Sequence, residues 1–279
     1  MKKLYGLVGH PLSHSLSPQI HQKLFELSSN KNSTYQLLDI SPSNFDTFIA
    51  AIPNLDGFNI TTPYKIKMFK NLKELDITAK KYSSVNTVNK ELNGIYKGYN
   101  TDILGFLKSI SSEGLSLSKN ILLLGCGGVG RMIAIETISQ KGNLTIAVKK
   151  PSIPKAQKLK TEINKQYEPA NIEIVDINKI PNIYFDLLIN ATPCGMFPEI
   201  NEMPVHPKVC SKISAIFDLI YNPHETMLMK NGKSYGSKII GGLEMLVWQA
   251  AYAQQIWNNM KFDETDIQNL INEIKNKFI

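Results

Sequence analysis

Hydrophobic positions along the chain occur in two patterns that alternate from the N-terminus onward. Short apolar runs, typical of strands, are separated by longer stretches in which apolar residues recur with helical spacing. Strands are expected over residues 4–8, 35–39, 58–60, 85–89, 95–99, 121–124, 144–148, 172–175, 187–189, 215–217 and 238–240. Helices are expected after residues 17, 42, 125 and 263, from residue 100 or 102 toward 111, and over residues 65–72 and 243–258. The alternation predicts an α/β protein.

Two short segments predict local geometry in more detail. Ser17 followed by Pro18 predicts a helix with serine at the N-cap and proline at the first helical position. Asn93-Gly94 between two strand runs predicts a hairpin with a type I′ turn, which needs positive φ at both central residues.

A second α/β segment begins at residues 121–124, a continuous apolar run typical of a parallel strand buried on both faces. It leads into Gly125-Cys126-Gly127-Gly128-Val129-Gly130, where backbone can approach a phosphate closely and a helix N-terminus can attract the anion. The motif predicts a dinucleotide site, with a simple tight turn as the alternative. A domain boundary is expected between residue 100 and residues 111–114.

The second strand of this segment ends in lysines rather than in an acid. An NAD enzyme usually places a carboxylate there to bind the ribose 2′-hydroxyl, whereas this chain has Lys149 and Lys150, followed by Lys155. Lysines at that strand end would neutralise a 2′-phosphate, which favours NADP. Because lysine is abundant throughout the chain, a coincidental pair is the alternative.

Composition narrows the class of protein. The net charge is +7 and the pI is near 9.1, but only one of the 31 basic residues, Arg131, is an arginine. Nucleic-acid binding is therefore not expected, since lysine lacks the bidentate fork that reads guanine or clamps phosphate. Three scattered cysteines predict neither a disulfide framework nor a metal site. We expect a cytoplasmic protein without export signal or membrane span, monomeric or homodimeric.

Two pairs of polar residues in the first part of the chain are candidates for substrate chemistry. Ser15 and Ser17 flank a helix start, where two hydroxyls could hold a carboxylate, although a capping serine explains Ser17 equally well. Lys65 and Asp102 could form the acid/base pair that moves a proton at a secondary alcohol. Their simpler interpretations are a surface lysine and an acid that complements a helix dipole.

Eight segments in this order together resemble the shikimate dehydrogenase family over nearly the whole chain. They are residues 9–18 (GHPLSHSLSP), 57–65 (GFNITTPYK), 85–87 (VNT), 98–102 (GYNTD), 125–131 (GCGGVGR), 189–196 (INATPCGM), 218–223 (DLIYNP) and 242–250 (GLEMLVWQA). The resemblance implies reversible, NADPH-dependent reduction of 3-dehydroshikimate to shikimate in aromatic amino-acid synthesis. It implies an N-terminal α/β substrate domain and a Rossmann-type, doubly wound parallel-sheet domain that binds NADP.

The resemblance also implies domain limits and residue roles. The substrate domain would comprise residues 1–103 completed by helices in 243–279, and the NADP domain residues 104–242. Lys65 and Asp102 would act at the reacting oxygen, Ser15, Ser17 and Tyr221 on the substrate carboxylate, and Thr61, Asn86 and Gln249 on its hydroxyls. Cofactor contacts are expected from Gly125, Gly127, Gly128, Val129, Gly130, Arg131, Lys149, Lys150, Asn190, Thr192, Met196 and Gly242.

The chain departs from the family pattern where the 2′-phosphate would bind. The family usually has Asn-Arg followed by serine or threonine at this strand end, whereas this chain has Lys149-Lys150-Pro151-Ser152. Lysine would have to replace the arginine, or cofactor preference would be relaxed. Alternatives are therefore a quinate/shikimate dehydrogenase that uses NAD or both cofactors, and a non-enzymatic NADP-binding regulator.

Overall fold

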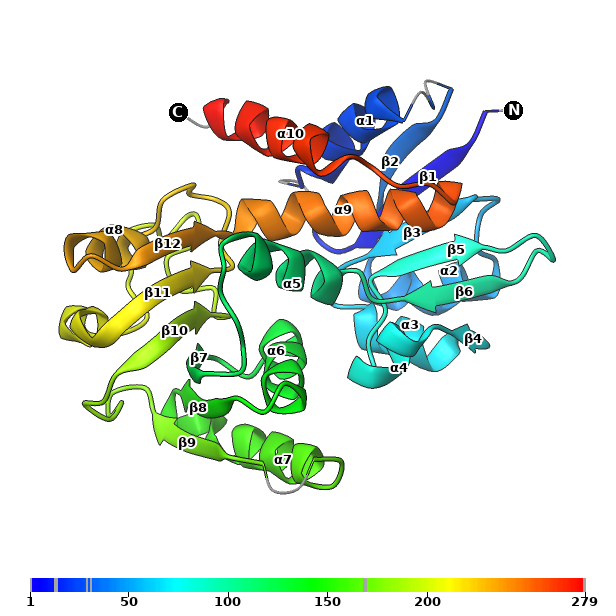
Figure 1. The fold of residues 1–279 in the computed structure, drawn as a ribbon. Helices are drawn as coiled ribbons and strands as arrows, with labels where there is room; N and C mark the ends of the chain where they lie inside the picture. Colours follow the sequence, from blue (N-terminus) through cyan, green and yellow to red (C-terminus); the bar gives the residue numbers. More distant parts are fainter. Residues whose placement is uncertain (1, 13–14, 29, 31, 168–169, 278–279) are drawn as a thin grey trace. The chain divides into compact units, whose positions relative to one another are not determined.

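The computed structural model describes the whole chain except residues 1, 13–14, 29, 31, 168–169 and 278–279. It divides into two compact units, one formed by residues 2–106 with Val247–Lys277 and one by Leu107–Leu246. The division falls within two helices, α5 (Asp102–Ser112) and α9 (Gly242–Asn258). Figure 1 labels the elements of both units.

The first unit contains a mixed six-stranded sheet in the order β2-β1-β3-β5-β6-β4. The strands are β1 (Leu4–Gly9), β2 (Thr34–Asp39), β3 (Gly57–Ile60), β4 (Glu74–Leu75), β5 (Thr87–Lys90) and β6 (Tyr96–Tyr99). The helices are α1 (Ser17–Leu27), η1 (Pro42–Asn44), α2 (Phe45–Ala50), α3 (Lys65–Asn71), α4 (Ile77–Tyr82), most of α9 and α10 (Glu264–Asn276). β5 runs antiparallel to both its neighbours, β3 and β6, while the other pairs are parallel.

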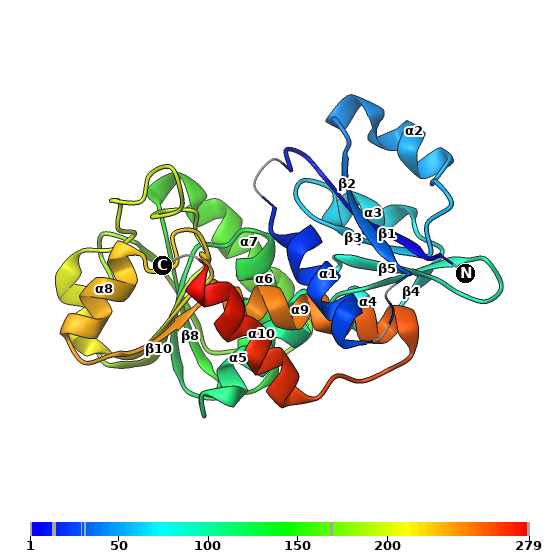
Figure 2. The same cartoon turned by 90° about the horizontal axis from the view of Figure 1, so that it is seen from above.

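Side chains alternate across this sheet and build a core on each face. On one face Tyr5 packs with Phe25 of α1 and Trp257 of α9. On the other face Val8 and Phe58 pack against residues of α2, α3 and α4. On the first face α10 lies beside α1, with Lys23 Nζ 3.1 Å from Glu273 Oε1, as both ribbon views show (Figures 1 and 2). Both faces are thus covered, which buries β1 and β3 almost completely.

The second unit contains a fully parallel six-stranded sheet in the order β12-β11-β10-β7-β8-β9. The strands are β7 (Asn120–Leu124), β8 (Asn143–Val148), β9 (Ile172–Asp176), β10 (Phe185–Asn190), β11 (Ile213–Asp218) and β12 (Lys238–Gly241). The helices between them are α6 (Gly128–Ser139), η2 (Lys150–Ser152), α7 (Ile153–Asn164), η3 (Pro207–Lys212) and α8 (Met227–Ser234). This strand order is the doubly wound Rossmann order, so the predicted fold class is confirmed.

Two local predictions were wrong. The helix cap before α1 is Leu16 rather than Ser17, and no side chain caps it; instead the Ser15 hydroxyl accepts a hydrogen bond from the Ser17 N–H at 3.2 Å. In the β5–β6 hairpin only Gly94 has positive φ, at 79°, and its N–H donates to the Glu91 carbonyl. That geometry is a type I turn closed by a left-handed glycine, which gives a longer loop than type I′.

No helix among the described residues has both the length and the apolar character needed to cross a membrane.

Candidate active site

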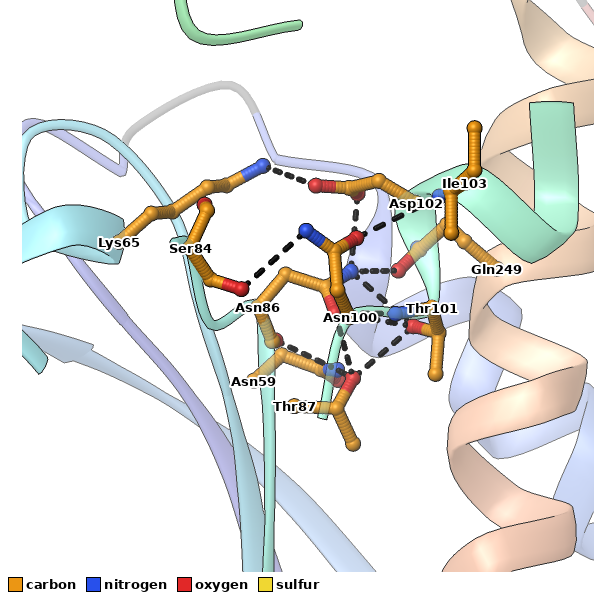
Figure 3. Close-up of polar contacts among 10 residues, drawn as sticks. All are labelled: Asn59, Lys65, Ser84, Asn86, Thr87, Asn100, Thr101, Asp102, Ile103 and Gln249. Carbon is orange, nitrogen blue, oxygen red and sulfur yellow. Dashed lines mark hydrogen bonds and ion pairs between the residues drawn. The ribbon is translucent and has the colours of Figure 1, made fainter. Parts of the chain in front are cut away.

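Lys65 and Asp102 form an ion pair in the first unit. Lys65 is the first residue of α3 and Asp102 the first residue of α5, and the Lys65 Nζ lies 2.6 Å from the Asp102 Oδ2. Their side chains are 24% and 12% exposed, so solvent or a small ligand can reach a pair that is otherwise enclosed. Figure 3 shows the two side chains pointing toward one another. Residues 37 positions apart are thus brought together by the starts of two helices.

The carboxylate of Asp102 is held on both sides. Its Oδ2 accepts from Lys65, and its Oδ1 accepts from the Asn86 Nδ2 at 2.8 Å (Figure 3). The same Asn86 amide reaches the Gln249 Oε1 on α9 at 3.3 Å. Lys65, Asp102, Asn86 and Gln249, all predicted from sequence, therefore meet in one polar cluster. A lysine ammonium carries three N–H donors, so it retains donors for a ligand beyond the one given to Asp102.

Behind this cluster lies a layer of polar residues for which the sequence predicted no role in the site. The Tyr35 hydroxyl donates to the Asn59 Oδ1 at 2.8 Å, and the Asn59 Nδ2 donates to the Thr87 Oγ1 at 3.0 Å. Asn59 falls on the face opposite Phe58 because side chains alternate along β3. In sequence, one signal pointed to this layer: a polar residue inside the short apolar run of residues 58–60.

The two predicted carboxylate-binding serines lie together at the start of α1. The Ser17 N–H donates to the Ser15 Oγ at 3.2 Å. Ser17 is buried, whereas Ser15 is half-buried.

Within the described part of the chain, two further predicted substrate residues form no hydrogen bond with that polar cluster. Thr61 follows β3, half-buried, with its N–H bonded to the Val8 carbonyl and its methyl group against Gly9. Tyr221 lies in the second unit, after β11, where burial raises the pKa of its hydroxyl.

The glycine-rich turn in the second unit has the shape that a phosphate requires. Gly125 has φ of 92°, and a Cβ at Gly130 would lie 2.5 Å from the Gly125 carbonyl oxygen, so the turn closes tightly on the helix. By contrast, a Cβ at Gly127 or Gly128 would meet nothing within 4 Å. The start of α6 therefore presents backbone N–H groups to open space, and the residues present fit a bound pyrophosphate.

A pocket of about 1030 Å³ extends from this turn across the ends of β7 and β8. It is lined among others by Gly125, Gly127, Lys149, Lys150, Ser152, Lys155, Thr192 and Met196. The three lysines are exposed, so the pocket combines a glycine-rich turn with accessible positive charge. A dinucleotide that carries a 2′-phosphate matches this arrangement in size and charge.

The remaining predicted cofactor residues differ in their surroundings. Asn190 is fully buried, and its side chain binds Asp218 at 3.0 Å and the Thr192 hydroxyl at 2.7 Å, so it holds the loop rather than facing the pocket. Arg131 lies 3.4 Å from Glu162 of α7. Gly242 begins α9, where a Cβ would lie 2.1 Å from the Leu219 carbonyl oxygen. Val129 lies in the first turn of α6.

Comparison with known proteins places these two sites in context. Residues 7–88 match the family model described as the shikimate dehydrogenase substrate-binding domain. A shikimate dehydrogenase (NADP(+)) from Methanococcus maripaludis is 41% identical, with 94% of each chain covered.

Solved structures agree over nearly the full length. A shikimate dehydrogenase in complex with NADP+ has a TM-score of 0.85 at 34% identity, covering 98% of this chain and 95% of that one. A Listeria monocytogenes shikimate 5-dehydrogenase in complex with shikimate and NAD has a TM-score of 0.84 at 25% identity, covering 97% and 96%.

Proposed function

This chain belongs to the shikimate dehydrogenase family, and we propose that it catalyses the reversible, NADPH-dependent reduction of 3-dehydroshikimate to shikimate. The observation that carries the proposal is the Lys65–Asp102 ion pair, held by Asn86 and joined through it to Gln249. Reduction of a ketone to a secondary alcohol requires a positioned donor at the reacting oxygen. A binding protein or regulator would have no use for such a pair beside groups suited to a polyhydroxylated acid.

Each residue of the first unit then has a defined task. Lys65 places its remaining N–H donors at the reacting oxygen. There the ammonium holds a proton and stabilises the negative charge that develops on the oxygen. Asp102, which accepts from both Lys65 and Asn86, keeps the ammonium oriented. Thr61, Asn86 and Gln249 bind the substrate hydroxyls, and Ser15 and Ser17 bind its carboxylate.

The second unit would hold the cofactor by its phosphates. Bound NADPH supplies the hydride. Gly127 and Gly128 leave room for the pyrophosphate at the start of α6, and Lys149 and Lys150 neutralise the 2′-phosphate. Because lysine acts as a point charge, we propose a preference for NADP over NAD that is weaker than an arginine fork would give.

We also propose that the protein works in a reducing compartment such as the cytoplasm, on small molecules alone. Cys126, Cys194 and Cys210 are all free cysteines, and burial raises the pKa of each thiol, which favours the protonated form.

The test is an assay of the purified protein with shikimate and NADP, following the absorbance of the reduced cofactor. Lys65→Ala should lower kcat by about 10²- to 10⁴-fold while NADP affinity and fold stay unchanged. Lys67→Ala is the matched control, since Lys67 lies on the same helix in an exposed pair with Asp46 and should leave kcat intact. Near-normal turnover in the Lys65 variant would refute the assignment.

The pair itself is tested by a double-mutant cycle. Asp102→Asn should also be severely impaired, and the double variant should lose less than the product of the two single losses if the groups act as a unit. Independent, multiplicative losses would contradict a working pair.

A further inference from the structure

Thr87 occupies the junction between the substrate-facing cluster and the polar layer behind it. It is the first residue of β5, its side chain is fully buried, and it lies one position after Asn86. Three polar groups surround its hydroxyl: the Asn59 Nδ2 at 3.0 Å, the Thr101 Oγ1 at 2.9 Å and the Asn86 Oδ1 at 3.1 Å (Figure 3). A side chain with no exposed surface cannot touch a ligand, so any effect on the reaction must pass through these neighbours.

The direction of hydrogen bonding through Thr87 follows from its donors and acceptors. The Asn59 carbonyl oxygen accepts from the Tyr35 hydroxyl, which turns the Asn59 amide nitrogen toward Thr87. That nitrogen can only donate, so the Thr87 oxygen accepts from it. The single Thr87 proton is then available to Thr101 or Asn86.

The orientation of the Asn86 amide depends on what surrounds its oxygen. The Thr101 backbone N–H donates to the Asn86 Oδ1 at 2.6 Å, and both threonine hydroxyls lie within 3.2 Å of the same oxygen. Because the Asn86 oxygen accepts from the Thr101 N–H, the Asn86 nitrogen must face the other way, toward Asp102, Gln249 and the Thr101 hydroxyl, whose oxygen lies 3.0 Å from that nitrogen. A reversed amide would place an oxygen against the Asp102 carboxylate, which is electrostatically unfavourable.

We propose that Thr87 is a positioning residue: its hydroxyl, supported by Asn59, holds the Asn86 amide in the orientation that fixes the Asp102 carboxylate for Lys65. The inference rests on the proposed function, because the group being positioned is the acid/base pair. A purely structural role would require only that the buried hydroxyl be satisfied, and would not affect the reaction beyond any loss of stability.

Thr87→Val tests this directly, because valine keeps the shape and removes the hydroxyl. We expect kcat to fall about tenfold, since small misplacements of reacting groups cost one to two orders of magnitude. The kcat–pH profile should shift, because the Asp102–Lys65 environment changes. Shikimate affinity, measured by titration calorimetry, should change less than kcat. Thr87→Ser, which restores the hydroxyl, should recover both kcat and the pH profile.

The matched control is Thr137→Val in the second unit. Thr137 is also fully buried, and its hydroxyl bonds only within α6, to the Ile133 carbonyl at 2.9 Å. The Thr137→Val substitution should lower thermal stability about as much as Thr87→Val does, while leaving kcat and the pH profile unchanged. If Thr87→Val does not fold, Thr87→Cys provides a side chain of similar size with a weak donor and should lower kcat in the same direction.

The outcomes separate this inference from the function on which it rests. Suppose that the wild type is active. A normal kcat and pH profile in the Thr87→Val variant, or a loss of kcat that Thr87→Ser does not restore, then overturns the positioning role alone. A wild type without activity toward shikimate overturns the proposed function and this inference together.

Discussion

Asp218 provides a quantitative test of the forces in the second unit. It ends β11 as a buried carboxyl, and it accepts hydrogen bonds from the Asn190 Nδ2 at 3.0 Å, the Thr226 hydroxyl at 2.7 Å and the Ile220 N–H at 3.1 Å. Burial raises its pKa from the ordinary 3.8 to about 6, although the three hydrogen bonds favour the charged form and lower the pKa. Desolvation is therefore the larger effect at this site.

The raised pKa makes stability depend on pH in a definite direction. In the folded state the carboxyl holds its proton up to about pH 6, whereas in the unfolded chain it releases the proton near pH 4. The folded state therefore binds more protons between these values, and the free energy of unfolding falls as the pH rises from about 4 to 6. A pKa difference of about two between the folded and unfolded states changes the free energy of unfolding by about 3 kcal/mol. That is a large share of a typical total stability of about 5–15 kcal/mol.

Asp218→Asn removes the charge, keeps the size and shape of the side chain, and reverses the direction of the hydrogen bond with Thr226. An amide oxygen can accept from Asn190 and Ile220, and the amide nitrogen can donate to the Thr226 oxygen, which has a second lone pair beside the one used by the Met229 N–H. Relative to wild type, the variant should therefore gain about 1–3 kcal/mol in going from pH 4 to pH 8.

The measurement is urea-induced unfolding followed by circular dichroism at several pH values, with wild type and variant compared at each. Glu173→Gln is the control, because Glu173 is an exposed acid on β9 of the same sheet and should show no such pH-dependent difference. A wild-type-to-variant difference in unfolding free energy that stays constant from pH 4 to pH 8 would show that Asp218 does not carry the burial cost derived above.

Three further predictions concern both units. Replacing Lys149 and Lys150 together by alanine should raise the KM for NADP several-fold while leaving NAD kinetics nearly unchanged. The preference of the wild type for NADP over NAD should weaken as the salt concentration rises. Unaltered NADP kinetics in the double variant would show that these lysines do not bind the 2′-phosphate. Ser15→Ala and Ser17→Ala should mainly raise the KM for shikimate, and an unchanged KM in both would leave these serines a structural role only. Burial lowers the pKa of His21 to about 3, so protonation of the unfolded chain should lower the free energy of unfolding by about 2 kcal/mol between pH 6.5 and 4.5. His21→Gln should remove that loss, which urea unfolding followed by tryptophan fluorescence would reveal.

The sequence alone determined most of the elements and the cofactor-binding turn, because both depend on local patterns; the short strand β4 and the helices α4, α7 and α8 were not predicted. Apolar runs marked the strands of both sheets, and the run before Gly125 together with the glycines after it identified the tight turn that the structure closes against Gly130. Short-range geometry that depends on the surrounding chain was less predictable. The Ser17 cap and the type I′ turn at Asn93-Gly94 failed because several backbone arrangements satisfy the same residues.

What only the tertiary structure decided is which distant polar groups meet. Asn86 and Gln249 are separated by 163 positions, and their contact depends on α9 packing beside β5 through the Trp257 indole bonded to the Val88 carbonyl. Thr87 shows the same limit more clearly. In the sequence it is one residue of the segment 85–87 with no predicted role, and its proposed positioning role follows only from the donors and acceptors that the folded chain places around it. Local periodicity specifies which face a residue occupies, but the partners across that face are set by the path of the whole chain.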